Sequence, residues 1–110
     1  MSSSTPHPLA LSGELSLRNI AELKTTLEQA LVKHPAIAID TAGVESADVG
    51  ALQLLLAAQK SADASGARMS LTASAASPFG RALIAAGLVA ADGRALVALT
   101  NTWTLTAEAR

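Results

Sequence analysis

The sequence predicts a single α/β domain in which helices pack against a β-sheet. Short apolar runs that contain β-branched residues alternate with longer segments whose apolar residues recur every three or four positions. The first pattern is typical of buried strands and the second of amphipathic helices. Half of the 110 residues are hydrophobic, so one domain can bury a sizeable core. Regular alternation of the two kinds of segment indicates a sheet with helices packed on it.

Composition excludes several classes of function. Eight basic and nine acidic residues give a net charge of −1, and aromatic residues make up 2% of the chain, which argues against binding of nucleic acid or of an anionic membrane. The absence of cysteine removes disulfides and thiolate metal sites. The start of the chain has no secretory signal pattern, and no apolar run is long enough to span a bilayer. We therefore expect a cytoplasmic protein that does not insert into the membrane.

The first third of the chain predicts a tail, an edge element and a helix. Residues 1–8 are rich in serine and proline and should form a flexible tail. In residues 9–15 leucines alternate with other residues, which indicates an edge hairpin or a strand with a bulge at Gly13. Ser16 is a candidate helix cap. Residues 19–33 carry apolar positions at steps of three and four and predict an amphipathic helix that ends before Pro35.

The middle of the chain predicts the centre of the fold. Residues 36–39 form a short apolar run that suits a covered strand, and residues 40–43 have turn chemistry. Asp48 can cap a helix that runs from about Val49 to Ala64. Gln59 interrupts the apolar stripe of this helix, so burial should weaken toward its end. The side chains expected to pack on the central strand are those of Leu52, Leu55 and Leu56.

The last third predicts two more strands and a third helix. Residues 67–73 alternate apolar and polar side chains, as a strand does. Ser77 followed by proline opens a helix that Gly87 closes. Residues 95–99 read as a short final strand, and residues 100–110 as a C-terminal extension. Trp103, in that extension, is more readily explained as a lid over the core than as a platform for a ligand.

The stretch from 40 to 56, DTAGVESADVGALQLLL, resembles the signature of STAS domains, the bacterial anti-sigma factor antagonists and their relatives. Supporting resemblances are Gly13-Glu14-Leu15 in the first strand and SPFGRALIAAGL at residues 77–88. The resemblance implies a STAS-type mixed sheet of four to five strands, packed against three or more α-helices and covering residues 9–99. Within the long stretch, the residues at matching positions are Asp40, Gly43, Val44, Asp48, Leu52, Leu55 and Leu56.

The resemblance also implies where a partner and a kinase would act. The family carries two hydroxyl residues where this chain has Val49 and Gly50, and the following glycine is replaced by Ala51. Gly50 stands at the usual phosphorylation position and cannot accept a phosphate, so we expect no phosphorylation there. Ser46 and Thr41 are the hydroxyls that remain near it. The residues expected to bind a partner are Thr41, Gly43, Ser46, Asp48, Val49, Gly50, Ala51 and Gln53.

Two hypotheses of function remain open. The sequence shows no nucleophile with a base, paired carboxylates, metal ligands or phosphate loop, so we expect no enzyme, no metal and no cofactor. The first hypothesis is a regulatory protein-binding module, similar to an anti-sigma factor antagonist, whose partner is an anti-sigma factor or a histidine-kinase-like ATPase. The second is a structural STAS subunit of a lipid-asymmetry-type ABC transporter, bound to its ATPase, or of a chemosensory complex. The sequence leaves a homodimer open.

Overall fold

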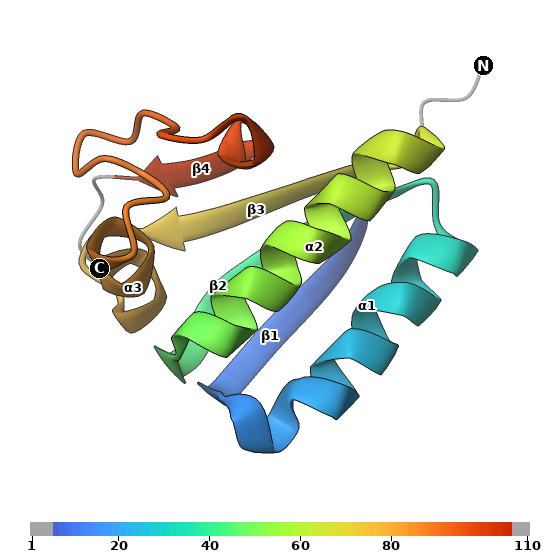
Figure 1. Ribbon diagram of the computed structural model, residues 1–110, viewed down its shortest axis with the longest axis horizontal. Coiled ribbons are helices and arrows are strands. Elements are labelled where there is room, and N and C mark those ends of the chain that lie inside the picture. The colour runs from blue at the N-terminus through green and yellow to red at the C-terminus, as the bar shows by residue number, and fades with distance from the viewer. Residues whose placement is uncertain (1–5, 107–110) are drawn as a thin grey trace.

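The structure, a computed structural model that describes residues 6–106, contains one four-stranded sheet and three α-helices (Figure 1). The predicted STAS-type α/β architecture is confirmed. Strands and helices alternate along the chain, as the sequence patterns indicate. In chain order the elements are β1 (His7–Leu15), α1 (Ile20–Lys33), β2 (Ala36–Ala47), α2 (Val49–Ser65), β3 (Arg68–Ser74), α3 (Pro78–Ala85) and β4 (Trp103–Thr106).

The sheet has the strand order β1-β2-β3-β4, and all three strand pairs are parallel. Of the two interpretations of residues 9–15, the edge hairpin, which would have made the sheet mixed, is therefore wrong for the described residues. The structure instead has the single strand, with an irregularity of its ladder next to Gly13. A helix lies between β1 and β2 and another between β2 and β3, and such crossovers bring successive strands back in the same direction. The antiparallel pairing that the structure does contain within residues 6–106 is a single bridge between Val89 and Ala95.

Strand β2 is longer than the sequence predicts. It continues through Asp40 and Gly43, where we expected a turn, and ends at Ala47. Two register shifts along its ladder with β1 give β2 one residue more than β1 each time, as β-bulges do. The turn-forming residues are thus absorbed as irregularities in a strand. At Gly43 a Cβ atom would lie 3.1 Å from Ser12 Cβ, so the glycine allows the two strands to approach closely.

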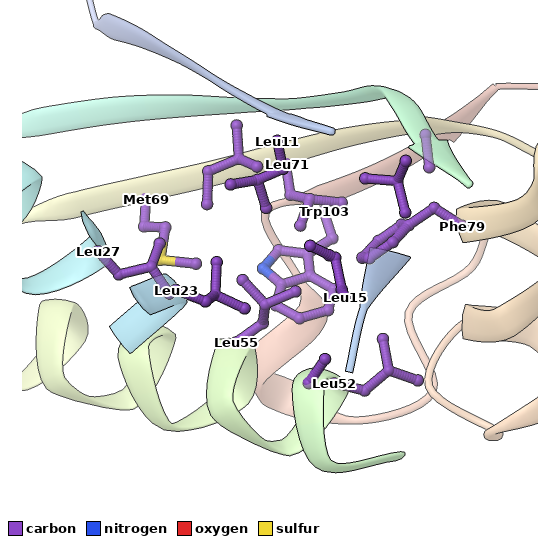
Figure 2. Close-up of a cluster of buried hydrophobic side chains, with 14 of the residues drawn as sticks. Leu11, Leu15, Leu23, Leu27, Leu52, Leu55, Met69, Leu71, Phe79 and Trp103 are labelled. Carbon is purple, nitrogen blue, oxygen red and sulfur yellow. The ribbon is translucent and has the colours of Figure 1, made fainter. Parts of the chain in front are cut away.

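Helices α1 and α2 contact each other and cover one face of the sheet (Figure 1). On that face β3 buries Met69, Leu71 and Ala73, whereas Arg68 and Thr72, at alternating positions, are exposed. Figure 2 shows leucines from α1 and α2 meeting this buried row in one cluster. The predicted packing of α2 on the central strands is confirmed, although Leu56 is only half-buried. The fully buried members of the cluster include Leu27, Ile37, Leu55, Leu71 and Phe79.

The C-terminal strand is not where the sequence predicted it. Residues 95–99 form no strand, and a short 3-10 turn spans Ala98–Thr100. Strand β4 instead begins at Trp103 and pairs with β3 from Leu71 onward. The indole of Trp103 is buried, and its Nε1 donates a hydrogen bond of 2.8 Å to Oε1 of Gln59. Gln59 is 1% exposed, so burial of α2 does not weaken there as expected. The indole satisfies its amide oxygen, and its amide nitrogen donates to Asp63 at 2.9 Å.

Strand β1 begins inside the predicted tail, at His7. Of the tail residues before it, Pro6 is described, and residues 1–5 lie outside the described part of the chain. The ring of His7 stacks on that of His34, with centroids 3.7 Å apart and planes 5° apart. Partial burial, followed by the charges of His7 and Lys33, holds the pKa of His34 below its usual value. Two face-to-face rings cannot point their nitrogens at one ion, so the stack is an intramolecular contact rather than a metal site.

Candidate functional site at the start of helix α2

The site is built where β1 and β2 end and α2 begins. The backbone N–H of Asp48 donates to the carbonyl of Leu15, at the end of β1. One carboxylate oxygen of Asp48 accepts from the N–H of Ala51 at 2.9 Å, which confirms the predicted helix cap. The other oxygen accepts from the N–H of Leu17 at 3.0 Å. Asp48 therefore fixes the start of α2 against the segment that connects β1 with α1.

That connection places apolar side chains over the position of Gly50. A Cβ atom at Gly50 would lie 3.2 Å from Cδ2 of Leu17 and 3.5 Å from Cδ1 of Ile20. Leu17 is nevertheless 71% exposed, and Val49, the residue before Gly50, is 64% exposed. Two large apolar side chains thus face solvent beside a residue without a side chain. We call the group Leu17, Ser46, Asp48, Val49, Gly50 and Gln53 the α2-start surface.

The structure brings most of the predicted partner-binding residues to this surface but not all of them. Ser46, Asp48, Val49 and Gln53 are exposed, and Gly50 is half-buried. Gln53 follows Val49 by one helical turn and so shares its side of α2. Gly43 is exposed as well, on the bulged part of β2.

Thr41 and Ala51 lie in the interior and are excluded from the surface. Thr41 is 1% exposed, and its hydroxyl donates a hydrogen bond of 2.7 Å to the carbonyl of Thr72 on β3. This hydroxyl holds two strands together and is buried from solvent. Ala51 is 0% exposed because it faces the core from the first turn of α2. Ser46 remains as the exposed hydroxyl among the residues named from sequence.

Sequence reasoning missed Leu17 and misassigned Ser16. Leu17 lies in a 3-10 turn before α1 and stands outside the apolar stripe of that helix, which is the signal that could have marked it as exposed. Its contact with Gly50 joins residues far apart in the chain, so no local pattern reveals it. Ser16 makes no side-chain cap bond, and its buried hydroxyl has no hydrogen-bond partner. The predicted cap at Ser16 is therefore wrong.

Neither a metal centre nor a membrane span emerges from the described residues. Between residues 6 and 106, no three His, Cys, Asp or Glu side chains gather closely enough to hold a metal ion. In the same range no helix combines the length and the apolar character needed to cross a bilayer.

The sequence of the chain matches a known protein family. The family model described as Mlab, STAS domain, matches residues 2–98. The chain belongs to this STAS family. Comparisons with curated proteins and with solved structures gave no match. The STAS family consists typically of non-catalytic binding modules.

We expect Asp48→Ala to destabilise this STAS domain by about 1–2 kcal/mol, because the N–H groups of Leu17 and Ala51 both lose their acceptor. Urea denaturation followed by circular dichroism measures the loss. Glu45→Ala, at an exposed position of β2, is the control and should change stability by less than about 0.5 kcal/mol. Equal effects of the two substitutions would show that Asp48 does not anchor the start of α2.

Proposed function

We propose that this STAS domain is a non-enzymatic, cytoplasmic regulatory module that binds a protein partner through the α2-start surface, without phosphorylation at Gly50. The observation that supports it most directly is that two large apolar side chains are exposed at this glycine: Leu17, which lies beside it, and Val49, which precedes it in α2. Single exposed apolar residues are ordinary, whereas contiguous exposed apolar patches mark interaction sites. The partner we expect is an anti-sigma factor or a histidine-kinase-like ATPase.

The chemistry of the surface argues for a complex that is not controlled by charge at the helix start. Gly50 has no acceptor atom for a phosphate, and Val49 beside it has none either. Asp48 already uses both carboxylate oxygens on backbone N–H groups. An added phosphate would meet this carboxylate, and it would also break the apolar contact that Leu17 and Val49 offer. The surface is therefore suited to a partner with an apolar patch of its own.

A second candidate function follows from the same feature. A helix start without a phosphate acceptor at Val49 and Gly50 suits a permanent subunit, so a structural role on a transporter ATPase or in a chemosensory complex remains the alternative. Both candidates need the α2-start surface, and they differ in the partner. The identity of the captured protein distinguishes them.

Affinity capture from the native host, followed by mass spectrometry, tests this proposal with two matched variants. Val49→Asp should lose the partner because it places a charge in an apolar contact, whereas Val32→Asp should retain it. Val32 is the matched control because it is also an exposed valine, at 86%, but lies near the end of α1 and outside the α2-start surface. We expect a loss of about tenfold or more in affinity for Val49→Asp, equivalent to about 1.4 kcal/mol. Retention by both variants would exclude the α2-start surface as the docking site.

A further inference from the structure

Strand β1 leaves one side of the sheet open. It is first in the strand order and pairs with β2 on one side, and within residues 6–106 no strand lies on its other side. An edge strand presents backbone N–H and C=O groups that another extended chain can bond. Pro8 has no N–H to offer at the start of this edge, and Gly13, with φ of 74°, bends the strand near its end. The part suited to pairing is therefore residues 9–12.

A groove runs along this open edge. Its volume is about 490 Å³, and α1 forms the wall opposite β1. Within it the side-chain amide of Asn19 donates a hydrogen bond of 2.7 Å to the carbonyl of Glu14. This bond occupies the carbonyl of Glu14 and marks the end of the part of β1 that an added strand can use. An edge strand beside a helix is the setting in which extended peptides add to a sheet. The lining residues are 10–15 of β1 and Asn19, Glu22, Leu23 and Thr26.

The charged and the apolar residues that line the groove together indicate which kind of peptide it can bind. Its ionisable lining residues are Glu14 and Glu22, both exposed, and no Lys, Arg or His lines it. The apolar lining residues are buried at the base of the groove and include Leu11, Leu15 and Leu23. An extended peptide that alternates apolar and basic side chains would direct one set toward the leucines and the other toward the carboxylates. A second copy of this chain fits poorly, because pairing β1 with β1 would place four carboxylates, two from each copy, along one interface.

From this geometry we propose that the groove between β1 and α1 binds an extended, basic segment of a partner protein as an additional strand. None of the residues that line the groove belongs to the α2-start surface, and the proposal does not rest on the function proposed above. It gives the domain two separate places at which proteins can bind.

NMR titration of the ¹⁵N-labelled protein tests the proposal. The probe is a nonapeptide that alternates valine and lysine, and its control replaces each lysine with glutamate. We expect the valine–lysine peptide to shift the amide signals of residues 9–13 and 19–26 while leaving Val49 and Gly50 unchanged, and the valine–glutamate peptide to shift none. Absence of shifts at a probe concentration of about 1 mM would overturn the proposal. A dissociation constant of that size corresponds to a binding free energy of about −4 kcal/mol.

Two charge-reversal variants locate the site within α1. Glu22→Lys should weaken binding of the valine–lysine peptide about tenfold, and Glu28→Lys, an exposed position of the same helix outside the groove, should change it less than about twofold. Equal weakening by both variants would indicate general charge attraction and contradict the proposal. Sedimentation that shows a dimer sensitive to Glu22→Lys would also contradict it, because the occupant would then be a second copy.

Discussion

Gly80→Ala should destabilise the domain by about 3 kcal/mol or more, at the upper end of what overpacking costs. Gly80 is buried in the first turn of α3, and a Cβ atom there would overlap the backbone carbonyl oxygen of Ser74 and lie 3.2 Å from Cα of Ala75. Backbone atoms of the preceding turn cannot rotate away as a side chain can, so α3 would have to move off the sheet. Urea denaturation of the two proteins measures the difference.

The same substitution at Gly50 is the matched control. There a Cβ atom would meet the exposed side chain of Leu17, which can move into solvent. Alanine is also a better helix former than glycine by about 1 kcal/mol. We expect Gly50→Ala to leave stability unchanged or to raise it slightly. Equal losses at Gly80 and Gly50 would contradict the close approach between α3 and the end of β3.

Leu55→Ala should cost about 2–5 kcal/mol, as truncation of a fully buried leucine does. Leu55 is 0% exposed and lies at the centre of the cluster between α2 and the sheet (Figure 2). Leu96→Ala, at a position that is 50% exposed, should change stability by less than about 0.5 kcal/mol. A loss of that small size for Leu55→Ala in denaturant melts would mean that this face of α2 is not buried.

Local chemistry predicted the helices well. The carboxylate of Asp48 caps α2, and Gly66 ends it with φ of 82°. The hydroxyl of Ser77 accepts from the N–H of Gly80 at the start of α3, with Pro78 in the first turn. Each of these signals acts within a few residues of the helix end. A sequence read locally can therefore find them.

The features that the sequence did not predict all depend on contacts between residues far apart in the chain. Residues 95–99 are more apolar than the segment that follows, yet β4 forms at Trp103, whose indole bonds to Gln59, 44 residues earlier. The turn-like residues from Asp40 to Gly43 became part of a strand because β1 pairs with them through bulges. Leu17 meets Gly50 through the same kind of contact. Partners so distant in the chain leave no local pattern.

Intact-mass measurement combined with affinity titration, on the domain incubated with its captured partner and ATP, tests the central claim most directly. We expect no added phosphate, undiminished binding by the wild type, and binding about tenfold weaker for Gly50→Asp because that carboxylate enters the apolar contact. Stoichiometric phosphate mapped to Ser46 that abolishes binding, or unchanged affinity for Gly50→Asp, would contradict a constitutive complex formed through the α2-start surface.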